Sequence, residues 1–127
     1  MQVFETFITV TSEDLDELNH VNNVKYVQWV QDVAKQHWQK GASKTVLENY
    51  FWVMLNHNIE YKNPAFLQNT LKIKTYIAQY KAATCTRIVE ISHNNLLVAK
   101  SQTTWCLMNA QTKRPVRITK EITNLFA

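Results

Sequence analysis

The stretch "NNVKYVQWVQDVAKQHWQKG", residues 22–41, carries the longest helical pattern in the chain. At about 100° per residue, its apolar side chains fall on one half of a helical wheel and most of its polar side chains on the other. The apolar half comprises Tyr26, Val27, Trp29, Val30, Val33, Ala34, His37 and Trp38. Asn22 or Asn23 suits the N-cap, and Gly41, the only glycine, is predicted to end the helix in a left-handed C-terminal cap. A long helix with one buried face is therefore expected.

Segments that alternate between apolar and polar residues lie on both sides of this helix and predict strands. They cover residues 4–10, 53–62, 71–77, 84–92 and 96–108. Asn94 and Asn95 tolerate the positive φ angles of a tight hairpin, and residues 43–50, "SKTVLENY", predict a short helical turn. Short connections between the last strands make them antiparallel neighbours. The expected architecture is α+β: one strand, one long helix, then four strands whose apolar faces cover that helix.

Composition limits the class of protein. The 127 residues fit one domain, 1–127, without repeat or linker. Residues 2–14 lack the pattern of a signal peptide and no apolar run could span a bilayer, so a soluble, cytoplasmic protein with no membrane contact is expected. The net charge of +4 favours an anionic ligand but no nucleic acid, because no dense basic stripe is present. Cys85 and Cys106 are expected to be small buried hydrophobes.

The stretch "DLDELNHVNNVKY", residues 14–26, collects three carboxylates, a histidine and three asparagines just before the helix. A simple strand-to-helix connection needs only a turn residue and one cap, so this excess of polar groups indicates chemistry. Asp14, Asp16 and His20 could be imagined as metal ligands. No second cluster of ligand residues supports that interpretation, and no metal site is predicted.

The same stretch fits the pattern D-x-D-x-x-x-H-V-N-N-x-x-Y-x-x-W, which resembles the signature of the 4-hydroxybenzoyl-CoA thioesterase branch of hotdog-fold proteins. The matching residues are Asp14, Asp16, His20, Val21, Asn22, Asn23, Tyr26 and Trp29. "IEYKNPAF", residues 59–66, and "TTWCLMNAQTKRPVRI", residues 103–118, resemble later segments of that family. Two departures occur: Asn19 replaces the usual glycine, although asparagine can adopt a left-handed conformation, and Gln68-Asn69 replaces a common Gly-Asp.

This resemblance implies a hotdog fold, in which a curved antiparallel five-stranded sheet wraps one long central helix. It also implies hydrolysis of acyl-CoA thioesters. The backbone N–H of Asn23 would polarise the thioester carbonyl, and Asp16 would act as nucleophile or as general base on water. His20 and Tyr26 match positions that line the site, and His20 could orient Asp16 or the attacking water. No cofactor is implied, because CoA is part of the substrate.

The resemblance also implies basic residues near the turn between the middle strands, where they would contact the phosphates of CoA. Tyr80, Lys81 and Arg87 occupy that region, although a solvated turn explains them equally well. Lys113, Arg114 and Arg117 could serve instead if the C-terminal segment folds over the cleft. The family further implies a homodimer or a dimer of dimers, with each site shared between subunits.

Structural readings of the same residues stay open. Asp14 and Asp16 could cap turns, His20 could cap or lie at the surface, and Tyr26 could be core. His37 is expected to be a core or interface histidine satisfied by a hydrogen bond.

Alternatives to the hydrolase also stay open. A non-catalytic acyl-CoA binding or sensing module is the main rival, and a structural domain comes third. Hotdog branches with a catalytic carboxylate on the central helix fit poorly, since that helix has no glutamate and Asp32 lies on its polar half.

Overall fold

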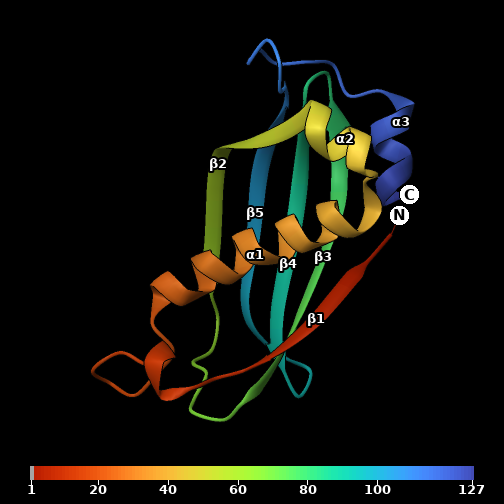
Figure 1. The fold of residues 1–127 in the computed structure, drawn as a ribbon. Helices are drawn as coiled ribbons and strands as arrows, with labels where there is room; N and C mark the ends of the chain where they lie inside the picture. The colour runs from red at the N-terminus through yellow and green to blue at the C-terminus, as the bar shows by residue number, and fades with distance from the viewer. Residues whose placement is uncertain (1) are drawn as a thin grey trace.

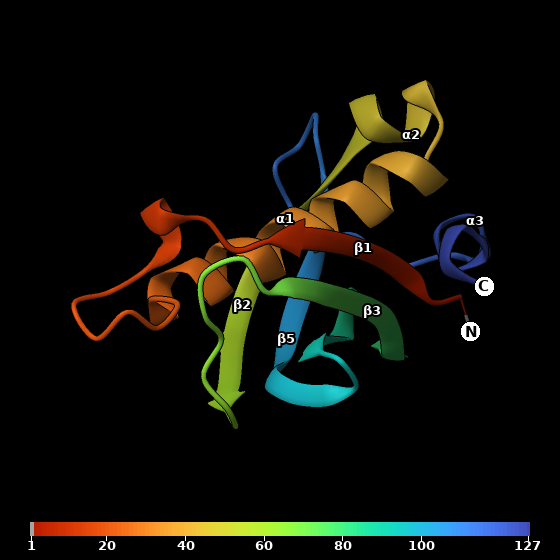
Figure 2. The same ribbon diagram turned by 90° about the horizontal axis from the view of Figure 1, so that it is seen from below.

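The computed structural model describes residues 2–127 and has one long helix lying across a curved five-stranded antiparallel sheet (Figures 1 and 2). The strand order is β1-β3-β4-β5-β2. The elements are β1 (Phe4–Thr9), η1 (Ser12–Asp14), α1 (Asn23–Gly41), α2 (Lys44–Asn49), β2 (Tyr50–Tyr61), β3 (Thr70–Lys81), β4 (Thr84–His93), β5 (Leu96–Asn109), α3 (Lys120–Thr123) and η2 (Asn124–Phe126). The predicted order of one strand, a long helix, a short helix and four strands is confirmed.

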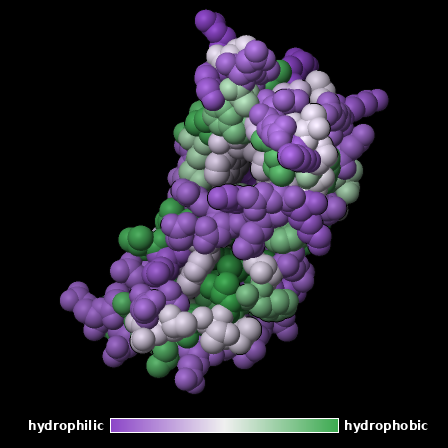
Figure 3. Space-filling view, in the orientation of Figure 1, coloured by the Kyte–Doolittle hydropathy of each residue, from purple (hydrophilic) through white to green (hydrophobic). Residues whose placement is uncertain are grey.

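Helix α1 has the predicted amphipathic character. The side chain of Asn22 caps it by accepting a hydrogen bond from the backbone N–H of Val24, at 2.9 Å. Its buried residues are Tyr26, Val30, Val33, Ala34, His37 and Trp38, all from the predicted apolar half. Its polar residues form a hydrophilic band across the molecule in Figure 3. The helix thus packs one face on the sheet and leaves the other in solvent.

The role predicted for Gly41 is wrong. Gly41 is the last helical residue and has no positive φ, and the helix is capped by Ala42 in an extended conformation. A Cβ atom on Gly41 would lie 3.0 Å from the backbone oxygen of Leu125. Glycine at this position therefore allows a close approach between the end of α1 and the C-terminal segment.

Register shifts occur in three of the four strand pairs, and the one in β2 overturns the predicted alternation there. A register shift between Met54 and Asn56 marks an irregularity at Leu55. Before this irregularity, Trp52 and Met54 are half-buried, whereas Val53 is exposed, as is Leu55 itself. After it, His57 and Ile59 are the half-buried residues. The predicted face carrying Val53 and Leu55 with His57 is therefore interrupted, because the extra residue reverses which side chains point inward.

Tight turns rely on residues other than glycine. Positive φ angles occur at Asn19, Gln68, Ala82, Asn94, Asn95 and Lys113. Asn94 and Asn95 form the predicted hairpin between β4 and β5. Asn19 adopts the left-handed conformation that was expected of it.

The core has two parts, one under each half of α1. Under the first half lie Val10, Val21, Tyr26, Val30, Val33, Ala65, Leu71, Ile73, Val89, Ile91, Val98 and Ala99. Under the second lie Trp38, Val46, Ile77, Cys85, Leu107, Ile122 and Phe126.

Cys85 and Cys106 are both buried and free, as predicted. Among residues 2–127, no helix is long and apolar enough to cross a membrane.

His37 joins α1 to the sheet through a buried polar network, which confirms its predicted role. The guanidinium Nη1 of Arg87 donates to His37 Nδ1 at 2.9 Å, so His37 Nε2 carries the ring proton and donates to Gln2 Oε1 at 2.7 Å. The same Nη1 donates to Thr75 Oγ1 at 2.9 Å. Phe4 stacks on the imidazole and Phe126 meets it edge-on. These contacts fix both the orientation and the tautomer of the ring.

We expect this network to make stability depend on pH. Burial, followed by Arg87 and Lys40, lowers the pKa of His37 to about 4, below its ordinary value of 6.5. Above pH 6.5 neither state is protonated at His37, and the folded state keeps its full stability. Between pH 6.5 and 4 the unfolded state binds a proton that the folded state does not, so the free energy of unfolding falls by up to about 1.4 kcal/mol per pH unit.

Urea unfolding at pH 7 and pH 5 measures this effect, with His37→Gln as the matched variant because its amide oxygen can still accept from Arg87. The variant should lose less stability than the native protein between the two pH values. Equal losses would contradict a neutral buried His37.

Candidate functional site

The segment between β1 and α1 folds into a compact loop at the N-terminal end of the helix. The backbone N–H of Asp16 donates to the carbonyl of His20 at 2.8 Å, and Leu15 pairs with Val21 in an isolated bridge. The positive φ of Asn19 turns the chain between these contacts. The loop thereby places Asp16 and His20 close to the first turn of α1.

Asp16 caps this loop with one of its two carboxylate oxygens. Its Oδ1 accepts from the backbone N–H of Leu18 at 2.9 Å and of His20 at 3.2 Å. Within residues 2–127 no group donates to Oδ2. The structural and the chemical interpretations of Asp16 are therefore compatible, because the cap holds the carboxylate in place and leaves one oxygen for a ligand.

The first turn of α1 offers an unpaired donor. The N–H of Asn22 donates to the carbonyl of Asp14, and the N–H of Val24 is capped by the Asn22 side chain. In the part of the chain that the structure describes, the N–H of Asn23 has no acceptor, and the residue is exposed. A free N–H at the positive end of a helix dipole can stabilise an oxygen that gains negative charge.

Tyr26 lies one turn further along and is 3% exposed. Its ring contacts Trp29 and Tyr61, with centroids 5.5 Å and 5.7 Å away. Its hydroxyl is buried without a hydrogen-bond partner among the described residues, since the nearby Ala65 backbone lies outside hydrogen-bond geometry. Burial, together with the charges of Tyr61 and Asp16, raises the pKa of Tyr26 to about 12. Tyr26 is thus both a core residue and a protonated phenol near Asp16.

His20 is half-buried at the edge of the same loop. Its ring meets Phe66 edge-on, with centroids 5.2 Å apart. The contact between His20 and Asp16 runs through the backbone N–H of His20, and within residues 2–127 its ring makes no hydrogen bond to the carboxylate. The ring is therefore placed to line the site, and orientation of Asp16 by the imidazole is not part of this geometry.

Asp14 has the structural role that stayed open for it, that of capping a turn. Its Oδ2 accepts from the backbone N–H and the hydroxyl of Thr11, at 2.8 Å and 3.2 Å. Its Oδ1 lies 3.4 Å from Lys25 Nζ. In residues 2–127 no three histidine, cysteine, aspartate or glutamate side chains gather closely enough to hold a metal ion.

The structure does not bring the predicted CoA-contacting residues to this site within one chain. Tyr80 and Lys81 end β3 at the opposite end of the sheet from the N-terminus of α1 (Figure 1). Lys81 is exposed, whereas burial raises the pKa of the half-buried Tyr80 to about 12. Arg87 is only 4% exposed, and its Nη1 is bonded to His37 and Thr75. A surface contact between Arg87 and a CoA phosphate does not fit this geometry, because its guanidinium points into the protein.

Sequence reasoning missed Tyr61 as a neighbour of the site. Its hydroxyl lies 3.5 Å from the backbone oxygen of Asn23, and its ring contacts Tyr26. A signal was present in the sequence, since Tyr61 belongs to the "IEYKNPAF" segment that resembles the family.

The family of the acyl-ACP thioesterase N-terminal domain matches residues 1–126. Among curated proteins no match was found.

Solved structures share the fold at low sequence identity. A substituted 4-hydroxybenzoyl-CoA thioesterase complexed with 4-hydroxybenzoyl-CoA has a TM-score of 0.90 and 14% identity, over 100% of this chain and 100% of that chain. YbaW, a probable thioesterase from Escherichia coli, has a TM-score of 0.85 and 23% identity, over 95% and 94%. A hypothetical protein from Staphylococcus aureus in complex with CoA has a TM-score of 0.86 and 22% identity, over 98% and 81%. These likenesses confirm the predicted hotdog fold.

Proposed function

The chain belongs to the family of the acyl-ACP thioesterase N-terminal domain, a family of thioester hydrolases, and from this premise we propose that it cleaves acyl-CoA thioesters to a free acid and CoA. One observation carries the proposal. Two groups lie together at the N-terminal end of α1: the backbone N–H of Asn23, which has no acceptor among residues 2–127, and the Asp16 carboxylate, whose Oδ2 receives no hydrogen bond from those residues. These are the two groups that attack on a thioester requires.

In this mechanism the thioester carbonyl oxygen accepts a hydrogen bond from the Asn23 N–H. Asp16 removes a proton from a water molecule whose oxygen attacks the carbonyl carbon, and the resulting oxyanion is stabilised at the helix N-terminus. The intermediate collapses, the C–S bond breaks, and the thiolate leaves and takes up a proton. Alternatively, a carboxylate oxygen of Asp16 attacks the carbonyl carbon, the C–S bond breaks with loss of the thiolate, and water then hydrolyses the resulting mixed anhydride to the free acid and the Asp16 carboxylate.

Tyr26 and His20 have supporting roles in this proposal. The phenol of Tyr26 stays protonated over the working pH range, so it packs near Asp16 without adding a negative charge. His20 would line the site, where its ring contacts Phe66 edge-on. Tyr80 and Lys81 remain proposed contacts of CoA. They lie at the opposite end of the sheet from Asp16, so they would act on the site of a partner subunit.

Release of free thiol from a panel of acyl thioesters tests this function. The panel includes aromatic, short-chain and long-chain acyl groups, each on CoA and on acyl-carrier protein, because the matching family is defined by the latter carrier. We expect thiol release in proportion to protein concentration for at least one acyl-CoA class. Stoichiometric binding of intact acyl-CoA, measured by calorimetry, without thiol release over hours would instead favour the binding or sensing module.

We also propose that two copies of the chain assemble through β2. This strand lies at an edge of the sheet and exposes Val53, Leu55 and Tyr61, so its unpaired backbone groups and apolar side chains need a cover. A second copy related by a two-fold axis would pair with this edge and bury these side chains. Such a pair would also set the N-terminus of one α1 beside strands of its partner.

The expected result is a homodimer in light scattering, with activity that falls when the dimer dissociates. Leu55→Lys should shift the equilibrium towards monomer and lower activity, because its charge would be buried at the interface. Lys100→Gln, an exposed position on β5, is the control. A fully active monomer of 14.9 kDa at assay concentration would contradict both the assembly and the shared site.

A further inference from the structure

Tyr61, the last residue of β2, connects this edge strand to the first turn of α1. Its hydroxyl donates to the backbone oxygen of Asn23 over 3.5 Å. Among residues 2–127, no other side chain of a strand donates to the backbone of α1. Burial raises the pKa of Tyr61, so the hydroxyl keeps the proton that it donates. The contact therefore ties the start of the helix to the sheet at the end where the proposed catalytic groups lie.

The irregularity at Leu55 places this hydroxyl on the helix side of the sheet. Side chains alternate along a regular strand, so a strand that turns Trp52 and Met54 inward would turn Tyr61 outward. The register shift between Met54 and Asn56 reverses this alternation. Tyr61 consequently faces α1, as its contacts with that helix show.

The ring of Tyr61 is held by a second contact with the same part of the helix. Its centroid lies 5.7 Å from that of Tyr26, which is 3% exposed and in turn meets Trp29 edge-on. Both partners lie within the first two turns of α1. A tyrosine side chain has only two rotatable bonds before its ring, so fixing its hydroxyl costs little conformational entropy.

The first turn of α1 is thereby held from two sides. On the loop side, the N–H of Asn22 donates to the carbonyl of Asp14 at 2.8 Å, and the Asn22 side chain caps Val24. On the sheet side, Tyr61 holds the carbonyl of Asn23. The N–H of Asn23 belongs to the residue that both restraints position. Displacing a group that acts in the transition state by about 1 Å can lower a rate about 10²-fold.

We propose that Tyr61 is a positioning residue for thioester hydrolysis, whose hydroxyl fixes the first turn of α1 so that the Asn23 N–H is aimed at the thioester carbonyl. The inference rests on the proposed function, because Tyr61 acts through the donor that hydrolysis would use. It gives the irregularity in β2 a role, since a strand without the extra residue would turn this hydroxyl away from the helix.

Tyr61→Phe tests the proposal, because it removes the hydroxyl and keeps the ring that packs on Tyr26 and covers the edge of β2. We expect kcat for thiol release to fall about 3- to 10-fold, the effect of losing one hydrogen bond, with KM little changed. Light scattering checks that the assembly is that of the native protein. Native kcat in the folded variant, or a change in KM alone, would overturn the proposal.

Tyr76→Phe is the matched control. It also removes one tyrosine hydroxyl and one hydrogen bond, since Tyr76 donates to Glu90 at 3.1 Å on the side of the sheet away from α1. Both variants can lose some stability, measured by urea unfolding, but only Tyr61→Phe should lower kcat. An equal fall in kcat for the two variants would show that the loss at Tyr61 is merely structural.

Combining Tyr61→Phe with Asn23→Pro, which removes the N–H, shows whether Tyr61 acts through that donor. Adding Tyr61→Phe to Asn23→Pro should change kcat by less than about twofold, because the group that Tyr61 positions is already gone. The same proportional loss in both backgrounds would overturn the positioning role. Near-native kcat in Asn23→Pro would contradict the proposed oxyanion donor itself, whereas native kcat in Tyr61→Phe alone leaves that donor in place.

NMR tests the contact without any substrate and hence independently of the proposed function. Donation by a hydroxyl polarises the Asn23 carbonyl, so its carbon resonance should move upfield in Tyr61→Phe and stay unchanged in Tyr76→Phe. A resonance that does not move in Tyr61→Phe would overturn the inference. No thiol release from any thioester of the panel, together with the expected shift, would overturn hydrolysis and leave the contact as a structural restraint only.

Discussion

Asp16→Asn is expected to lower the turnover of the best acyl-CoA substrate by a factor of about 10²–10⁴ or more. Asparagine keeps an Oδ1 atom that can accept from the N–H groups of Leu18 and His20, so the loop should hold its shape. The amide that replaces Oδ2 can neither take a proton from water nor attack a carbonyl. The effect should therefore appear in kcat, measured by thiol release, while KM and the unfolding midpoint change little.

Asp14→Asn is the matched control, since it makes the same chemical change two residues away. Asp14 binds Thr11 and Lys25, and its loss should cost up to about 1 kcal/mol of stability with turnover changed only a few-fold. If folded Asp16→Asn kept near-native turnover, the catalytic role of Asp16 would be wrong and the binding module would gain support.

Asn23→Pro should lower kcat about 10²- to 10³-fold, because proline removes the N–H proposed to stabilise the oxyanion. Position 23 is the first residue of α1, where proline is well tolerated. The preceding residue, Asn22, already has φ −65° and ψ 136°, the extended conformation that proline requires of its predecessor. The substitution thus deletes one donor without breaking the helix.

Asn23→Ala separates the backbone from the side chain. It keeps the N–H and removes only an exposed amide, so its turnover should stay close to that of the native protein. Circular dichroism checks that α1 is intact in both variants. A folded Asn23→Pro protein with turnover within about threefold of native would exclude the Asn23 N–H as the oxyanion donor.

The helix and the strands could be predicted because their patterns are local. The apolar half of residues 26–38 follows from helical geometry. The hairpin at Asn94-Asn95 follows from the local tolerance of asparagine for positive φ angles. The irregularity in β2 could not be predicted, because an added residue becomes visible only against the partner strand β5. The role of Gly41 was missed for a similar reason, since it depends on the approach of Leu125, far away in the sequence.

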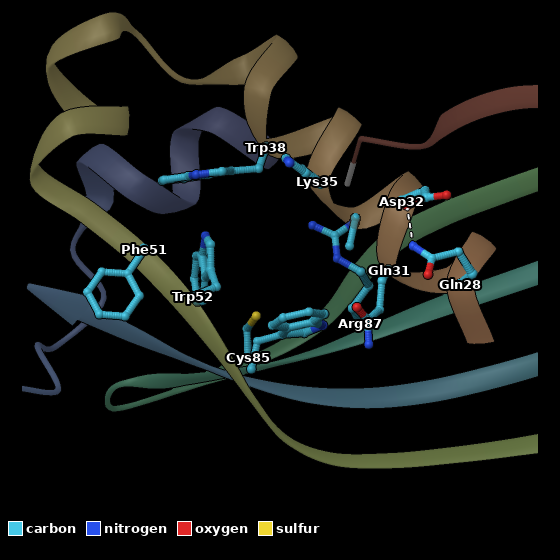
Figure 4. Close-up of a pocket in the computed structure, with 11 residues that line it drawn as sticks. Gln28, Gln31, Asp32, Lys35, Trp38, Phe51, Trp52, Cys85 and Arg87 are labelled. Atoms are coloured by element: carbon cyan, nitrogen blue, oxygen red, sulfur yellow. Dashed lines mark hydrogen bonds between the residues drawn. The ribbon is translucent and has the colours of Figure 1, made fainter. Parts of the chain in front are cut away.

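The candidate site likewise has a part that could be predicted from the sequence and a part that could not. Residues 14–26 are close in sequence, so their clustering at the start of α1 was predictable. The position of Arg87 was not, because a basic residue in a strand normally faces solvent. Only the folded sheet shows that it faces His37, fifty residues earlier in the chain. The cavity lined by Arg87, Trp38 and Trp52 (Figure 4) is formed jointly by α1, β2, β4 and β5. No local pattern in the sequence could therefore predict it.

The six positive φ angles bear on how this protein could be adapted to heat. An L-residue in the left-handed region costs about 1–2 kcal/mol, and asparagine, with its local hydrogen bonds, is better tolerated there than alanine, glutamine or lysine. Ala82, Gln68 and Lys113 therefore hold their turns against an intrinsic preference. Ala82 lies in the turn between β3 and β4, Lys113 lies in the connection that follows β5, and all three residues are exposed. Thermostable variants can thus be sought first in connections between secondary-structure elements, where gains need not disturb chemistry or packing.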